Sequence, residues 1–408
     1  MRTALANCTV IDCTGKAPQK DMVIVIDDDK IAELKPWTTR EEVGPNDMRF
    51  LDLGGGYVLP GLWDVHVHLG DLIPDPKNLI KSESPIDAAI RAGRNAIDAL
   101  RVGITGMRVL GDRDYIDVAW KRAFEANVFV GPRLVVAGKY ICATGGHGWS
   151  APLAVEVDGP YEMRKTVREQ LKQGADWIKL AVTGGISTAG ESMGESQFLL
   201  DEIQAATDIA HQKGKRVSVH AGGPEGIKIA IRGGVDCVEH GYYMDDEAIE
   251  MMMENHVFYV PTINVTQDTD SLEDKGFPDF MISKTRASTR SHRESLQRAL
   301  KAGVPIACGA DANPVSEYAR REIECLVKVG VPQMDALIAA TRTAADLCQV
   351  DDQLGTVEVG KLADLIVLAA DPLEDISNIR KVKLVLKGGK AVDMSPEEGL
   401  ADFCEVFF

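Results

Sequence analysis

Short runs of apolar residues recur along the middle of the chain, and most are separated by segments with helical spacing. Eight runs are apolar on both faces, as expected for parallel strands that are buried on both sides. They are DVHVHL (64–69), TGMRVLG (105–111), RLVVAG (133–138), WIKLAV (177–182), RVSVHA (216–221), DCVEHG (236–241), VFYVPT (257–262) and VPIACGAD (304–311). Eight strands that alternate with helices favour a closed (β/α)8 barrel over an open doubly wound sheet.

Two of the segments between these runs have well-marked helix boundaries. SPIDAAIRAGRNAIDALRVG begins with Ser84 as N-cap and Pro85 at the first helical position, and Gly103 follows its end. LDEIQAATDIAHQKGK (200–215) is amphipathic and stops at Gly214. The large apolar residues of the first helix fall near one face: Ile86, Ile90, Ile97 and Leu100.

The two ends of the chain differ from its middle. Residues 2–59 contain short alternating strands such as MVIVIDDDKIAELK, and residues 354–393 contain LADLIVLAA and VKLVLKGGKAV with turn residues between them. Neither end has enough strands for a sound sheet alone. We therefore predict an α/β fold with a (β/α)8 TIM barrel over residues 61–350 and a small β-sandwich domain built from residues 1–60 plus 351–408.

Composition and charge exclude several classes of partner. The 408 residues are 45% hydrophobic and 26% charged, which is ordinary for a soluble globular protein. Lys and Arg number 45 and Asp and Glu 62, so the net charge of −17 repels nucleic acid and anionic membranes. No apolar run approaches the roughly 20 residues of a membrane helix, and the first residues lack a signal-peptide pattern. We expect a cytoplasmic protein that binds a small-molecule substrate; the oligomeric state stays open, with a homo-oligomer among the options.

Eight cysteines are scattered along the chain without CxxC pairs, at positions 8, 13, 142, 237, 308, 325, 348 and 404. In a large cytoplasmic protein this pattern indicates reduced thiols that serve packing rather than chemistry.

The first strand carries two histidines on one face. In GLWDVHVHLG (61–70), His66 and His68 are two positions apart, so their side chains point the same way. Further unusual residues lie in or near the ends of later strands, where such barrels build their active sites: Lys179, His220, His240 and Asp311. Buried unpaired imidazoles are costly, and imidazole with carboxylate suits Zn, Mn, Fe or Co. The pattern indicates a metal site. Three histidines in helical or loop contexts are expected to be surface or packing residues: His211, His256 and His292.

Lys179 lies between Ile178 and Leu180, where an ammonium would be desolvated and the neutral amine favoured. A neutral amine can add carbon dioxide, and the carbamate offers two anionic oxygens able to bridge two metals. We therefore expect two divalent metal ions, zinc first among them, bridged by carboxylated Lys179. The other ligands would be His66 and His68 on one metal, His220 and His240 on the second, and Asp311 on the first metal and the water between. The alternative is a lysine in a salt bridge with an acid of a neighbouring strand.

These motifs, in this order, resemble the amidohydrolase superfamily: PGLWDVHVHLG, WIKL, VSVHA, VEHG and CGAD. The tail LGTVEVGKLADLIVLAADPLEDI resembles the stretch with which these enzymes return to their small β-sandwich domain, so the resemblance covers nearly the whole chain. Within the superfamily, ICATGGHG and EHGYYMDDEAI resemble the branch of imidazolonepropionase-like dipeptidases. That branch includes Xaa-Pro dipeptidases (prolidases), carboxypeptidases and ochratoxin-type amidases. Where it often reads HAHG, this chain has HAGG, so Gly222 replaces a histidine and leaves the contacts to the substrate's leaving half open.

The resemblance implies a metal-dependent amidohydrolase that cleaves the amide bond of dipeptides or N-acyl amino acids through a metal-bridging hydroxide. Asp311 is expected to take the proton of that hydroxide and pass it to the departing amine. His147, in TGGHG, is expected to hydrogen-bond the developing oxyanion; the alternative is a loop histidine packed on Trp149. Tyr242 is expected to donate its hydroxyl to the substrate's α-carboxylate; the alternative is a rim aromatic without contact.

Two other functions stay open. One is a hydrolase or deaminase of a cyclic amide such as an imidazolone; enzymes of that kind in this superfamily usually hold one metal and lack the bridging lysine, so Lys179 counts against it. The other is a non-enzymatic scaffold on the same fold, which would be marked by lost ligands, whereas all six are present here.

Overall fold

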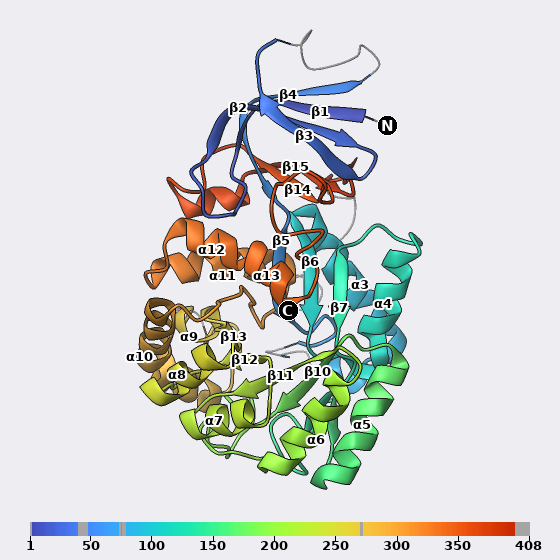
Figure 1. The fold of residues 1–408 in the computed structure, drawn as a ribbon. Helices are drawn as coiled ribbons and strands as arrows, with labels where there is room; N and C mark the ends of the chain where they lie inside the picture. The colour runs from blue at the N-terminus through green and yellow to red at the C-terminus, as the bar shows by residue number, and fades with distance from the viewer. Residues whose placement is uncertain (1, 40–47, 73–74, 76–78, 270–271, 396–408) are drawn as a thin grey trace.

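The central part of the chain forms parallel strands, as the apolar runs predict. The computed structural model describes residues 2–39, 48–72, 75, 79–269 and 272–395. One sheet consists of β5 (Leu62–Val67), β6 (Ile104–Val109) and β7 (Arg133–Val136). A second has the order β13-β12-β11-β10-β8-β9, of which β13, β12, β11 and β10 are labelled in Figure 1. Its members are β8 (Tyr140–Cys142), β9 (Ala154–Glu156), β10 (Trp177–Ala181), β11 (Arg216–Ala221), β12 (Cys237–His240) and β13 (Phe258–Val260). Seven of the eight runs overlap a strand.

The eighth run does not form a strand of its own. Residues 304–311 make one isolated bridge, between Ile306 and Tyr259, and the amide of Val65 donates to the carbonyl of Cys308 at 2.9 Å. Between β7 of the first sheet and the residue before β10 of the second, the amide of Asp176 donates to the carbonyl of Val136 at 2.7 Å. The strands therefore form two sheets whose edges are linked by hydrogen bonds, not the one continuous closed sheet that the pattern predicted.

Helices pack along these sheets. The first predicted helix is α3 (Pro85–Arg101), and the second is α6 (Leu200–His211). Ser84 caps α3 in a capping box with Asp87, and Gly103 follows its end with a φ of +97°, as its sequence predicts. The remaining helices are α2 (Leu79–Ser82), α4 (Ile116–Glu125), α5 (Gly159–Gln173), α7 (Pro224–Arg232), α8 (Asp246–Glu254), α9 (Asn264–Gln267), α10 (Asp279–Ala302), α11 (Val315–Lys328), α12 (Gln333–Ala339) and α13 (Arg342–Leu347).

The spacing of apolar residues predicted which face of α3 is buried, and the structure confirms this only in part. Ile86 and Ile90 are exposed, whereas Leu100 is buried. The buried face instead carries small residues, together with two polar side chains that find partners: Ala88, Arg91, Ala92, Gly93, Asn95, Ala96 and Ala99. Small side chains let neighbouring helices approach closely, so packing shape decides the face here more than hydrophobicity does.

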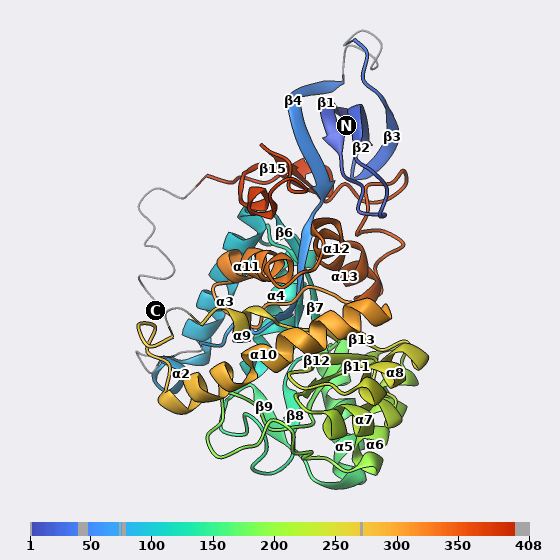
Figure 2. The same ribbon diagram turned by 90° about the vertical axis from the view of Figure 1, so that its left-hand side faces the viewer.

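Strands from both ends of the chain join in one sheet, as predicted. Its order is β16-β15-β14-β4-β1-β2-β3, and it lies at the opposite end of the molecule from the six-stranded sheet (Figure 2). Its strands are β1 (Arg2–Val10), β2 (Gln19–Asp27), β3 (Lys30–Pro36), β4 (Arg49–Pro60), β14 (Leu365–Leu368), β15 (Val382–Lys387) and β16 (Lys390–Ala391). We predicted a sandwich, but the described strands are one connected sheet, because the long strand β4 pairs with β1 along one edge and with β14 along the other.

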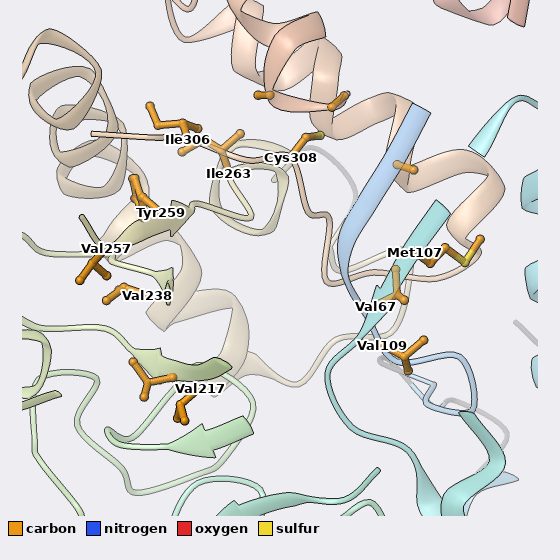
Figure 3. Packing of buried hydrophobic residues seen from close by; sticks show 14 of the residues in the cluster. Val67, Met107, Val109, Val217, Val238, Val257, Tyr259, Ile263, Ile306 and Cys308 are labelled. Carbon is orange, nitrogen blue, oxygen red and sulfur yellow. The ribbon is translucent and has the colours of Figure 1, made fainter. Parts of the chain in front are cut away.

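A continuous apolar core supports the central strands. Val67 and Val109 belong to the three-stranded sheet, Val217 and Val238 to the six-stranded sheet, and all are fully buried in one cluster with residues of segment 304–311 (Figure 3). Close packing of this kind has little compressibility. It therefore gives the side chains on the opposite faces of these strands fixed positions.

Seven cysteines are free and buried, which agrees with packing thiols; Cys404 lies outside the described residues. Among the described residues, no helix combines the length and apolar character needed to span a membrane.

Candidate metal centre

Eight side chains singled out in the sequence line one cavity of about 190 Å³. They come from strands or loops that are far apart in the chain: His66, His68, His147, Lys179, His220, His240, Tyr242 and Asp311. The three histidines expected to be surface or packing residues do not line it. His211 pairs with Asp236, and His256 is exposed. His292 is fully buried and is hydrogen-bonded to Thr266.

His66, His68 and Asp311 form a compact group of potential ligands. Their ligand atoms all lie within 4.8 Å of one another. Oδ1 of Asp311 is 3.6 Å from Nε2 of His66 and 3.5 Å from Nε2 of His68. The amide of Asp311 donates to the carbonyl of His66 at 2.8 Å, so a backbone hydrogen bond between segment 304–311 and β5 sets this arrangement.

His220 and His240 lie beside this group. Their ring centroids are 4.4 Å apart, and the rings of His240 and His66 are 5.0 Å apart. Nδ1 of His240 is hydrogen-bonded to the hydroxyl of Thr262 at 2.8 Å. His240 has a φ of +71°, which is uncommon for a residue with a side chain and turns the chain at the end of β12. Strain of this kind is frequent at functional sites.

The histidines of this cluster are neutral. Burial lowers the pKa of His66 to about 3 and that of His68 to about 4. It also lowers the pKa values of His220 and His240 well below the ordinary value. Neutral imidazole is the form that binds metal. Burial has the opposite effect on an acid and raises the pKa of Asp311 to about 7.

Lys179 is buried on β10, with 4% of its surface exposed. Its Nζ has no hydrogen-bond partner among the described residues, and no carboxylate of those residues lies within ion-pair distance. Burial lowers the pKa of this amine to about 8, so a fraction is neutral near neutral pH. The alternative of a salt bridge with a neighbouring strand therefore finds no support in the described part of the chain.

His147 lies in the loop after β8 and is held by a second loop. Its Nδ1 is 2.8 Å from Oε2 of Glu191, which also accepts from the amide of Gly185. Its ring stacks on that of His220, with centroids 4.2 Å apart. Trp149, which the alternative interpretation placed against His147, is half exposed.

Tyr242 is buried against the same cluster. Its ring stacks on His240 with a centroid distance of 5.3 Å and meets the edge of His292 at 5.1 Å. The neighbouring Gly222 explains a departure seen in the sequence. A Cβ there would lie 2.5 Å from the carbonyl oxygen of Met193 and 2.9 Å from Tyr242, so a histidine would require this loop to move.

The sequence did not lead us to several groups that support the cluster. Glu239 connects Nδ1 of His66 with Arg108, and Asp64 accepts from the amides of His66 and Ala310. Glu191 orients His147. An acid or arginine inside an apolar strand, as in VEHG, GMRV and LWDV, was the available signal for three of these residues.

The residues fit divalent metal ions. Four neutral imidazoles, one carboxylate and an unpartnered buried amine converge on one cavity, and they would be costly to bury without such a partner. His66, His68 and Asp311 would hold one ion. The structure thus brings together all six side chains that were expected to be ligands.

Comparisons with known proteins show which family the chain resembles. Ochratoxinase of Aspergillus niger is 31% identical over 364 residues, covering 82% of this chain and 75% of that protein. Imidazolonepropionase of Micrococcus luteus is 26% identical over 399 residues, covering 90% and 92%. The crystal structure of a Xaa-Pro dipeptidase with methionine bound in its active site is 34% identical, with a TM-score of 0.87 and coverage of 96% and 100%. The sequence pattern of the amidohydrolase family matches residues 57–392. The chain belongs to the amidohydrolase family.

Proposed function

We propose that this protein is a metal-dependent amidase that cleaves the amide bond of a dipeptide or N-acyl amino acid. The observation that carries the proposal is the convergence of His66, His68, His220, His240 and Asp311 around the unpartnered amine of Lys179. The two sheets would act together as one (β/α)8 barrel over residues 61–350, beside a composite domain of residues 1–60 and 351–408. The similarity to the Xaa-Pro dipeptidase structure supports the proposed barrel and the proposed composite domain.

In this proposal two divalent metal ions, with zinc as the first candidate, occupy the cavity. His66 and His68 would hold one ion, His220 and His240 the other, and carboxylated Lys179 would bridge them. The ions supply Lewis acidity, which polarises the scissile carbonyl and makes water more acidic. Asp311 lines the cavity beside His66 and His68, and its carboxylate would accept a proton from attacking water and return it to the leaving amine.

His147 would stabilise the carbonyl oxygen as negative charge develops on it. With Nδ1 bound to the carboxylate of Glu191, Nε2 is left for a substrate. One donor of this kind is worth about 10²–10³ in rate.

A substrate carboxylate would find two partners in the cavity. Tyr242 lines it, and its hydroxyl has no hydrogen-bond partner among the described residues. Lys275 is the lining ammonium outside the histidine cluster; it donates to the hydroxyl of Tyr318 at 3.2 Å and lies 3.7 Å from Asp268. Asp268 also pairs with Arg321 at 3.0 Å. The group of Lys275, Arg321 and Asp268 therefore has two positive charges and one negative charge.

A screen of dipeptides and N-acyl amino acids on zinc-loaded protein tests this function. Proline at the leaving position comes first and a basic residue second, and an ochratoxin-type amide and an imidazolone are the comparison substrates. Turnover of the first group supports the proposal, and turnover of the imidazolone alone overturns it. Tyr242→Phe should raise KM for substrates with a carboxylate more than for uncharged amides.

A further inference from the structure

We propose that Glu239, held by Arg108, is a positioning residue that sets the tautomer of His66 and so leaves Nε2 of this imidazole to bind metal. The inference rests on the metal site of the proposed function. It assigns a purpose to an ion pair buried inside the strands that no step of the proposed reaction uses.

The contacts of Glu239 divide its two oxygens between different partners. Oε2 is 2.8 Å from Nδ1 of His66. Oε1 accepts from Nη2 of Arg108 at 2.7 Å, from the thiol of Cys237 at 3.0 Å and from the hydroxyl of Ser218. The side chains of His66, Arg108 and Glu239 are at most 1% exposed, so water does not compete for these bonds.

Arg108 is itself fixed. Its Nε donates to the carbonyl of Val65 at 2.7 Å, and its guanidinium lies over the ring of Trp177, 4.6 Å from the centroid. A guanidinium can only donate, and an ionised carboxylate can only accept. Arg108 therefore holds Glu239 as an ionised acceptor with a fixed orientation.

An acceptor at Nδ1 requires the proton of neutral His66 to sit on that nitrogen. The lone pair is then on Nε2, which is the nitrogen that faces Asp311 at 3.6 Å. His68 reaches the same state through the carbonyl of Gly111, 2.9 Å from its Nδ1. A backbone carbonyl cannot be altered by substitution, whereas the acceptor for His66 is a side chain, so His66 is the one of these two histidines that a substitution can test directly.

Glu239→Gln is the decisive variant. Arg108 and Ser218 present donors to one end of the new amide, so its oxygen should turn to them and its NH2 group should face Nδ1 of His66. His66 must then accept at Nδ1 and carry its proton on Nε2, where it blocks the metal. We expect metal affinity to fall about 10–100-fold.

The double variant Arg108→Met/Glu239→Gln separates this effect from a general disturbance. Without the guanidinium, which can only donate, the amide can turn so that its oxygen accepts from His66 and its NH2 group donates to the hydroxyl of Ser218. No carboxylate is left unpaired in this variant. Metal affinity should recover at least partly relative to the single variant. Ser218→Ala is the matched control, because it removes another bond to Glu239 and leaves the acceptor at Nδ1 in place.

Zinc affinity is measured by chelator competition on all four proteins, and the tautomer of His66 by ¹⁵N-histidine NMR of zinc-loaded and chelator-treated protein. The proposal is supported if zinc affinity falls in the single variant and recovers in the double variant, and if His66 of the native protein carries its proton on Nδ1. Native affinity in Glu239→Gln, an equal loss in Ser218→Ala, or Nε2–H in the chelator-treated native protein overturns it. The NMR result decides the question if a variant fails to fold. Native protein without metal affinity would instead remove the proposed function.

Discussion

The imidazoles of His147 and His220 stack with their centroids 4.2 Å apart and their planes 25° from parallel. One belongs to a loop and the other to β11, and the carboxylate of Glu191 lies 2.8 Å from Nδ1 of the loop histidine, His147. The ring of a loop residue is thereby held by contacts with Glu191 and His220.

This contact predicts a graded loss of rate. His147→Ala should lower kcat about 10²–10³-fold, because an oxyanion donor is lost, and Glu191→Gln should lower it less. Metal content and the thermal midpoint should stay near native values. Trp149→Ala is the control in the same loop. If it lowers kcat as much as His147→Ala, His147 acts through packing instead.

Metal removal should abolish activity and lower stability together. A ligand that binds only the folded state at 100 times its Kd stabilises it by about 2.7 kcal/mol, so chelation should lower the midpoint of denaturant unfolding and added zinc should restore it. Elemental analysis of the native protein should give close to two equivalents. One equivalent or fewer with full activity contradicts a binuclear centre.

Lys179 should carry a carbamate in the active protein. Growth or reconstitution with ¹³C-bicarbonate should give a carbamate carbon signal that is absent from Lys179→Ala. That variant should also lose metal and nearly all activity, and Lys179→Glu should recover binding only in part because its stem is shorter. A metal-loaded, active crystal with a bare amine at Lys179 would show that another group bridges the ions.

Lys275 should contribute to recognition of the substrate carboxylate. Lys275→Met should raise KM for an N-acyl amino acid by more than it raises KM for the corresponding amide, since a lost uniform contact is seen in KM. Arg321→Met is the matched control, because Arg321 pairs with the same Asp268 but does not line the cavity. Equal effects of Lys275→Met on the two substrates would remove this role.

Gly93 in α3 should resist enlargement. A Cβ there would lie 1.8 Å from the ring of Trp120, whose Nε1 is tied to the carbonyl of Ala89 at 2.7 Å. Gly→Ala in an open helix stabilises by about 1 kcal/mol, but overpacking costs about 1–3 kcal/mol and should win here. Denaturant unfolding should show Gly93→Ala to be less stable than the native protein. Gly194→Ala, whose added Cβ meets no atom within 4 Å, should change stability little.

The sequence by itself determined eight of the side chains that meet at the site and where most central strands run. Alternation within a strand places His66 and His68 on one face, and parallel strands bring their carboxyl ends to one edge, so the six expected ligands could be named without coordinates. Capping chemistry likewise fixed the start of α3 at Ser84, because those contacts are local.

Tertiary structure alone decided what depends on contacts between distant segments. The spacing of Ile86 and Ile90 indicated a buried face for α3, yet the close approach of neighbouring elements selected the alanines. The terminal strands form one sheet because β4 pairs with β1 along one edge and with β14 along the other. The periodicity of the sequence does not identify Glu239 and Glu191 as partners of histidines. Periodicity indicates only the face of an element on which a residue lies, whereas an acid orients a histidine because the two side chains are close in space.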